Sequence, residues 1–471
     1  MTHTLLRFAC SAALLAAAAP AFAADGDLDP TFGTGGLALA GIADAFGGAT
    51  ACKPVLQPDG KILTCGTRQI GSSADFFVVR FTADGQLDPT FSFDGKVTID
   101  FTGANGTDQA TALALQSDGK IVVAGNTNPD RGSGHYDFAV ARLDADGTLD
   151  TTFGAGTGKK VIAFDLAGGT GNDNAADVAL QSDGRIVVAG SVATTGNGSD
   201  IGIARLLTDG SPDASFNLNG KVSFGFDLVG STTKDDIATR VAIDHAGRIV
   251  VAGAADAGAD AIGTDFAVAR VRANGTLDPD FDADGRATVA FDVGLSKADA
   301  AFGLAIDTDD SIALSGNVDV SPSMTANQDI GIVKLLPDGS PDTTFGVGGK
   351  TIVTFDETPN GLDFGLDVAI RDDGRLVIAG AAAYSSSNLY GALVRLLANG
   401  DLDAGFGTLG RRSYDFGLTT PSSQAFLGLT LAGDAIYAGG IAVVSDSGSE
   451  VDVFIARMNE DTIFADGFDG A

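Results

Sequence analysis

Tryptophan is absent from this 471-residue chain, and cysteine and histidine occur only three times each. The lack of the largest aromatic side chain argues against a sugar-stacking cleft. Two histidines, His135 and His245, lie 110 residues apart and outside the N-terminal segment. Neither stands in a zinc, serine-nucleophile or phosphate-binding motif, so those enzyme classes find no support. No catalytic, cofactor-binding or metal-binding residue is assigned, and no cofactor is expected.

Basic residues are also scarce. The 29 lysines and arginines face 61 aspartates and glutamates, and the formal net charge is −32. Binding to phosphates needs clustered lysine and arginine, and the chain has no such cluster. We therefore expect no nucleic-acid partner and no attraction to anionic lipid. A hydrophobic content of 44% argues against disorder as the meaning of the charge.

Long apolar runs are missing apart from one at the N-terminus. Residues 8–20 form a short apolar segment that follows Arg7 and precedes a cleavage site of the Ala-x-Ala type at Ala21-Phe22-Ala23. This pattern predicts a signal peptide over residues 1–23, because the run is too short to span a bilayer. The protein is expected to be exported to the periplasm, the outer surface or the medium, without membrane insertion.

Cysteine in the remaining chain is limited to Cys52 and Cys65, which flank one predicted hairpin, since Cys10 lies in the signal. An exported protein can form a disulfide. In the favoured register the two residues fall slightly out of opposition, so a disulfide and two buried thiols both stay open.

One short sequence pattern recurs along the chain. An aspartate is followed three residues later by phenylalanine, and successive phenylalanines lie 59 to 65 residues apart. Such a period indicates a repeat architecture. The copies are Asp29–Phe32, Asp88–Phe91, Asp150–Phe153, Asp213–Phe216, Asp278–Phe281, Asp342–Phe345 and Asp403–Phe406.

The repeat unit reads as four short strands. Residues 110–116 are small and apolar, and a Ser-Asp-Gly turn at 117–119 leads to the β-branched residues 120–125. A third strand at 137–143 and a fourth at 159–165 enclose the Asp–Phe turn. Four strands with turns about every ten residues predict an antiparallel blade, and blades in a ring form a β-propeller. The fold class is all-β, a seven-bladed propeller over residues 25–460.

The chain begins and ends within a repeat unit and not at the boundary between two units. A strand of the fourth type, residues 37–42, comes before any hairpin, and the last strand of the third type is 453–458. We predict that these two pair and that the N-terminal strand closes the ring of a monomer. An open solenoid, or a blade phase that starts at the N-terminus, is the alternative.

The repeat resembles the delta-60 repeat family of bacterial exported proteins. The matching residues are Gln116-Ser117-Asp118-Gly119-Lys120 and Gly147-Thr148-Leu149-Asp150 with Phe153-Gly154, together with IVVAG and DFAVARL. The resemblance implies a β-propeller-like fold and no general activity. Residues 461–471 contain IFADGFDG, which is similar to a short tail of exported Gram-negative proteins; a decayed eighth repeat is the alternative.

Two patterns of charge suggest chemistry. Asp144, Asp146 and Asp150 form a D-x-D-G-x-x-D loop, which is interpreted as structural turns, with calcium as the weaker alternative. A basic residue closes each third strand, five positions after an aspartate in most copies, as in Asp75 and Arg80. An odd separation places the two on opposite strand faces. We predict that the basic residue pairs with the aspartate of the Asp–Phe pattern, which we call the signature aspartate, or with a residue of a neighbouring blade.

The irregular loops suggest where a ligand would bind. They connect strands two and three or successive blades, so they emerge on one face, opposite the constant Asp-Gly turns. The favoured function is a non-catalytic exported binding or scaffold protein that recognises a protein or glycan at the cell surface. The alternative is a propeller hydrolase or lyase with carboxylates, His135 or a bound cation at the channel mouth. The loops are residues 126–136, 254–264, 317–328 and 357–363.

Overall fold

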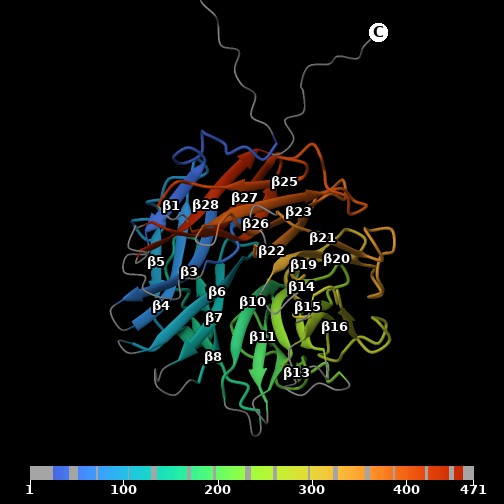
Figure 1. Cartoon of the computed structure of the whole chain (residues 1–471). Helices are drawn as coiled ribbons and strands as arrows, with labels where there is room; N and C mark the ends of the chain where they lie inside the picture. Colours follow the sequence, from blue (N-terminus) through green and yellow to red (C-terminus); the bar gives the residue numbers. More distant parts are fainter. Residues whose placement is uncertain are drawn as a thin grey trace, which may run out of the picture.

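The protein is an all-β molecule built from short antiparallel sheets around a common centre (Figure 1). The computed structural model describes residues 25–41, 51–70, 73–103, 106–128, 135–166, 171–194, 198–228, 235–257, 263–294, 297–321, 327–355, 361–385, 388–419, 423–444 and 450–459. The predicted signal peptide and the IFADGFDG tail lie outside these residues. Among the described residues no helix is long and apolar enough to cross a membrane.

The described residues form six sheets. Five have four strands each, ordered β1-β28-β27-β26, β10 to β13, β14 to β17, β18 to β21 and β22 to β25. The sixth has eight strands and joins β2 to β5 with β6 to β9 through one parallel residue pair, Ala74 with Thr107. The predicted four-stranded antiparallel units are therefore present. Neighbouring strands follow one another in the chain in the units β10 to β13, β14 to β17, β18 to β21 and β22 to β25, whereas β1 joins the sheet of the last strands beside β28.

The element bounds are β1 Leu37–Gly41, β2 Val55–Leu56, β3 Ile62–Ile70, β4 Ser73–Phe81, β5 Lys96–Ile99, β6 Thr107–Leu115, β7 Ile121–Asn128, β8 Asp137–Leu143, a 3-10 turn Gly154–Gly156, β9 Lys159–Ile162, β10 Asn174–Leu180, β11 Ile186–Ala193, β12 Ser199–Leu206, β13 Lys221–Phe224, β14 Ile237–Ile243, β15 Ile249–Asp256, β16 Thr264–Val271, β17 Arg286–Val289, β18 Ala300–Ile306, β19 Ile312–Asp319, β20 Gln328–Leu335, β21 Lys350–Val353, β22 Asp363–Ile370, β23 Leu376–Ala383, β24 Leu389–Leu396, β25 Arg411–Tyr414, β26 Gln424–Ala432, β27 Ala435–Val443 and β28 Val451–Asn459.

The inner hairpin of each unit forms as its turn chemistry predicts. Between β6 and β7, the N–H of Gly119 donates to Gln116 O at 2.9 Å, and Gly119 has a φ of +86°. Glycine adopts this conformation without steric cost. The β-branched strand that follows is fully buried. Valines and alanines of β7 and β8 pack with those of β10 and β11 between neighbouring sheets, so the core is divided among the sheet interfaces.

The basic residue that ends the third strand pairs with the signature aspartate, as predicted. The arginine also lies over the signature phenylalanine ring, at 4.6 Å for Arg80 and Phe91. Lys334 differs and lies 3.9 Å from Asp307. The Arg–Asp pairs are Arg80–Asp88 (2.7 Å), Arg142–Asp150 (2.6 Å), Arg205–Asp213 (2.8 Å), Arg270–Asp278 (2.8 Å), Arg395–Asp403 (2.8 Å) and Arg457–Asp29 (3.2 Å).

The signature turn of each copy also contacts the next copy. A backbone N–H just after the signature phenylalanine donates to a carbonyl in the following Asp-Gly or Asn-Gly turn, and the last copy donates to Asp25 at the beginning of the described chain. The signature therefore joins neighbouring units. These donor–acceptor pairs are Gly33 to Asp84, Ser92 to Asp146, Gly154 to Asp209, Asn217 to Asn274, Asp282 to Asp338, Gly346 to Asn399 and Gly407 to Asp25.

The first and last strands of the described chain lie in one sheet. β1 pairs antiparallel with β28, with Leu37 opposite Ala456 and Gly41 opposite Asp452. The expected strands therefore do pair. Residues 37–41 lie opposite 452–456, whereas the prediction placed 37–42 opposite 453–458. Phe32, just before β1, is fully buried, and Asp25 forms a 2.9 Å ion pair with Arg395 of β24.

Cys52 and Cys65 form a disulfide, which resolves the two alternatives left open by the sequence. Both sulfurs are buried, and Cys52 N–H donates to Cys65 O at 2.8 Å. The innermost strand of this unit, β2, has only two residues, and Pro54 beside it has no N–H for a longer ladder. The disulfide holds this shortened inner segment against β3.

The inner strands meet at the centre of the molecule. Each longer inner strand contains a bulge at the same repeat position, for example between Ala238 and Arg240 of β14. The guanidinium of Arg240 crosses to other sheets and donates to Leu366 O at 3.1 Å and Leu427 O at 3.4 Å. Lys53, just before β2, pairs with the fully buried Asp367 of β22 at 3.0 Å, so this ion pair also joins two sheets at the centre.

Candidate functional site

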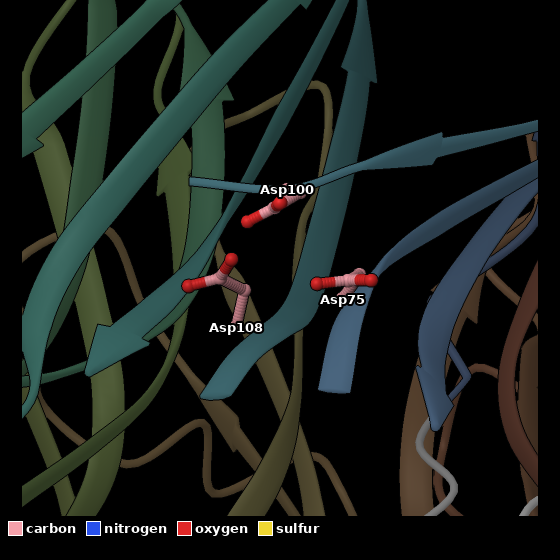
Figure 2. Close-up of side chains that lie close together, drawn as sticks. All are labelled: Asp75, Asp100 and Asp108. Carbon is pink, nitrogen blue, oxygen red and sulfur yellow. The ribbon is translucent and has the colours of Figure 1, made fainter. Parts of the chain in front are cut away.

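Three aspartates from adjacent repeat units converge at one end of the strands. Asp75 lies near the start of β4, Asp100 directly follows β5, and Asp108 lies near the start of β6. One carboxylate oxygen of each lies within 4.8 Å of the others, and Figure 2 shows the three side chains directed into a common space. Asp75 and Asp108 are buried, and Asp100 is exposed. The connections on this side of the sheets are the irregular loops.

Hydrogen bonds separate the roles of the three carboxylates. Both oxygens of Asp108 are taken, one by Phe101 N–H and one by the Thr127 hydroxyl, each at 2.7 Å. Asp100 accepts the N–H groups of the two residues that follow Phe101 in its own turn. Asp75 receives one weak hydrogen bond, from the Ser73 hydroxyl at 3.3 Å. Both oxygens of Asp108 thus hold neighbouring chain segments, whereas these bonds to Asp100 fall on one oxygen and Asp75 receives one long bond.

The environment shifts the protonation of the buried members. Burial raises the pKa of Asp75, and the charge of Asp100 raises it further, against the opposing charges of Arg68 and Lys159. Burial also raises the pKa of Asp108, against its two hydrogen bonds. Arg68 lies directly opposite Asp75 on β3. A buried carboxyl group with a raised pKa beside a second carboxyl group is an arrangement that suits acid–base chemistry.

The buried aspartate is a structural element that other copies share. Asp173, Asp236, Asp299 and Asp363 each accept the N–H of the phenylalanine that ends the preceding unit, as Asp108 does. This bond closes the loop between neighbouring units. Asp108 is therefore explained by the fold alone.

Asp100 departs from most copies of the repeat. It precedes Phe101, as Asp415 precedes Phe416, whereas in other copies the acid follows the phenylalanine, as in Phe164-Asp165 and Phe291-Asp292. Within the described part of the chain, the Asp75 group is the one place where three such carboxylates converge. A repeat alignment that tracked this one-residue offset would have marked Asp100 together with Asp415. The sequence analysis treated Asp75 only as a neighbour of Arg80 and missed the group.

A related carboxyl makes the stability of the protein depend on pH. Burial, together with the charges of Asp299 and Asp292, raises the pKa of Asp265 to about 6. A raised folded-state pKa stabilises the protein below the unfolded value, and this stability is lost as the pH rises through about 6.

We therefore expect the free energy of unfolding to fall between pH of about 4 and 7 and the fall to be shallower in Asp265→Asn. Urea unfolding across this range measures it, with the exposed turn residue Asp372→Asn as the matched control. Parallel curves for wild type and Asp265→Asn would contradict the assignment.

The residues proposed from sequence are placed elsewhere. Asp150 binds Arg142 and Lys120, and Asp146 accepts both the N–H and the hydroxyl of Thr148 within its turn. The pKa of Asp150 is lowered because these hydrogen bonds, with those from Thr152, outweigh its burial. Asp144 pairs with Lys120. These contacts support the structural interpretation, and calcium binding at this loop stays a prediction.

The two histidines are apart from the carboxylate group. His245 is exposed in the turn between β14 and β15, and its Nδ1 lies 2.7 Å from Asp310 Oδ1 of the next unit. His135 is exposed and lies just before β8, two residues before Asp137. Much of the four irregular loops lies outside the described residues.

Comparison with known proteins supports the repeat assignment. A family model described as a domain of unknown function (DUF5122) β-propeller matches residues 57–91, 116–153, 181–216, 247–281, 323–345 and 371–406. The chain is a β-propeller repeat protein. No curated protein matches its sequence.

Solved structures of similar fold include several enzymes. The polysaccharide lyase Uly1 is 12% identical, with 91% of this chain and 93% of that chain covered and a TM-score of 0.46. A PL25 ulvan lyase is 11% identical, with coverage of 93% and 95% and a TM-score of 0.48. An exo-1,5-α-L-arabinanase from a bovine ruminal metagenomic library is 12% identical, with coverage of 77% and 97% and a TM-score of 0.32.

The favoured functional prediction was wrong. The sequence analysis expected a non-catalytic binding or scaffold protein, whereas the similar solved structures include polysaccharide lyases and glycosidases. They agree with the alternative, a propeller enzyme. At this low identity and these TM-scores the likeness concerns the fold alone and assigns no substrate to this chain.

Proposed function

We propose that the protein is a propeller hydrolase that cleaves glycosidic bonds with Asp75 and Asp100. The observation that carries the proposal is the convergence of these carboxylates within 4.8 Å, one buried and one exposed. Glycoside hydrolysis uses a pair of carboxyl groups in different environments, one as acid and one as nucleophile or base. The chemistry needs no bound cofactor.

Each residue has a distinct part in this mechanism. Asp75, whose pKa is raised by burial and by Asp100, donates a proton to the leaving oxygen. The exposed Asp100 carboxylate attacks the anomeric carbon, and water activated by the deprotonated Asp75 later releases the sugar. The short separation supports retention, because inverting enzymes place the two carboxyl groups about 6.5–9.5 Å apart. Asp108 positions the loop that carries Asp100.

We expect Asp75→Asn and Asp100→Asn each to lower kcat by about 10²- to 10⁴-fold. The assay measures new reducing ends from a panel of plant and bacterial polysaccharides. Asp137→Asn is the matched control. Asp137 holds the position of Asp75 at the next junction, where the charges of Asp173 and Asp165 act on it, but among the described residues three carboxylates converge within 4.8 Å only in the Asp75 group. Equal activity in all three variants would exclude this site. Unsaturated uronate products would instead assign a lyase, and loss of activity on chelation would assign a cation.

We propose further that the sheets are seven blades in a closed ring. The chain of inter-unit hydrogen bonds that runs from Gly33 to Asp84 and returns from Gly407 to Asp25 supports this count. The eight-stranded sheet then divides into two blades, since one residue pair joins its halves. The Gln-Ser-Asp-Gly-Lys turn at 116–120 supports repeats of the delta-60 type.

Export as a monomer completes the proposal. The N-terminal pattern of residues 1–23 supports a signal peptide, and the Cys52–Cys65 disulfide suits an oxidising compartment. A surface role for the tail at residues 461–471 is tested by removing it and following where the protein is found.

A further inference from the structure

Two tyrosines form an aromatic platform between β23 and β24. The rings of Tyr384 and Tyr390 lie 4.8 Å apart at an interplanar angle of 18°. Among the ring pairs of the described residues, this one is stacked in parallel, and the others are tilted or edge-on. Tyr384 is 47% exposed, although a large apolar ring is usually covered. Its outer face is therefore available to a ligand.

The platform replaces the acidic arrangement found at other junctions. Tyr390 occupies the position that holds Asp75 or Asp137 in earlier copies, and Gln424 occupies that of Asp108. Gln424 is buried and its amide donates to Tyr414 O at 2.8 Å, so it keeps the loop-closing role without a charge. This junction has thus exchanged two buried acids for an aromatic and an amide.

Polar groups surround the platform and hold it in place. The Tyr390 hydroxyl donates to the Asp415 carboxylate and also receives a hydrogen bond from the Asn388 side chain. Tyr384 N–H donates to Asn388 O at 3.0 Å, which ties the two ends of the loop together. A rigid apolar ring edged by hydroxyl, amide and carboxylate groups matches a sugar ring, whose C–H face is apolar and whose edge bears hydroxyls.

We infer that Tyr384 and Tyr390 form a substrate-binding platform for an uncharged polysaccharide. The inference rests on the proposed hydrolase function, and it adds the substrate class. β23 and β24 contact β26, and β26 contacts β2, so one sheet separates the platform from the carboxylate group. Both lie where the irregular loops emerge. A polymer lying across this face could contact both, whereas a polyuronate would meet Asp415 and the −32 net charge.

The test measures binding separately from cleavage. In an Asp75→Asn background, calorimetry follows the binding of four neutral hexasaccharides, from cellulose, xylan, mannan and laminarin, and of a polygalacturonate hexamer. We expect one of the neutral probes to bind, Tyr384→Ala to weaken it about tenfold or more, and Tyr384→Phe to retain it. Tyr136→Ala, in another irregular loop, is the matched control and should bind as the parent does.

Each other outcome decides against the platform. Absence of binding for all four neutral probes, equal affinity in Tyr384→Ala, or tighter binding of polygalacturonate overturns the inference even if the wild type hydrolyses a glycan. Conversely, binding that depends on Tyr384 sustains the platform even where no bond is cleaved, so the two proposals fail separately. Because the chain has five tyrosines and no tryptophan, a change in tyrosine fluorescence provides a second readout.

Discussion

Deletion of residues 25–41 should lower the free energy of unfolding by more than about 5 kcal/mol. It removes β1 from its five-residue pairing with β28 and exposes the edge of that strand. It also removes the fully buried Phe32, and truncation of a buried phenylalanine alone costs about 3–5 kcal/mol. The ion pair between Asp25 and Arg395 and the Gly407 bond to Asp25 are lost with it.

Thermal and urea unfolding of the shortened chain measure this effect. The matched control lacks residues 1–24 only, which retains every contact of β1, and it should unfold like the full chain. A chain without residues 25–41 that unfolds at the same denaturant concentration as this control would show that the β1–β28 pairing carries little of the stability. It would also weaken the proposal of a closed ring.

Local chemistry was predictable from sequence wherever it repeats. The turn at Gly119 needs a residue with positive φ, and the copies supply glycine or, at Asp310, an aspartate with a φ of +67°. In the last copy the positive φ of +56° belongs to Gly433, which precedes Asp434. The pairing of Arg142 with Asp150 followed from strand parity, which excludes the aspartate five residues before the arginine.

The candidate site was not predictable in the same way. Asp75, Asp100 and Asp108 belong to two repeat units, and their convergence depends on how those units pack. The repeat also hides them, because an aspartate stands at equivalent positions in several copies. Tyr384 and Tyr390 are a different case. The sequence shows that Tyr390 replaces the aspartate of earlier copies, but it does not show that Tyr384 stacks on Tyr390, because the loop between β23 and β24 determines that contact.

Replacement of Arg240 by methionine should cost about 3 kcal/mol of stability. Arg240 joins β14 to carbonyls of two other sheets, and its charge opposes the effect of burial on Asp177. Each hydrogen bond to a charged group contributes about 1.5–3 kcal/mol, so the two lost bonds to the carbonyls together account for about 3–6 kcal/mol. We expect the lower end, since Asp177 keeps hydrogen bonds from Val178 N–H at 2.8 Å and Val241 N–H at 2.9 Å.

The pH dependence distinguishes this electrostatic effect from lost packing. Burial already raises the pKa of Asp177, and removal of Arg240 should raise it further. A group with a raised folded-state pKa loses its stabilising contribution as the pH rises, so Arg240→Met should be more harmful at pH of about 8 than at about 5. The second change Asp177→Asn should restore part of the stability at the higher pH, and Arg286→Met, at a rim position, is the matched control. A loss that is independent of pH and unaffected by Asp177→Asn would assign Arg240 a packing role alone, in which its bonds to Leu366 and Leu427 hold the inner strands together.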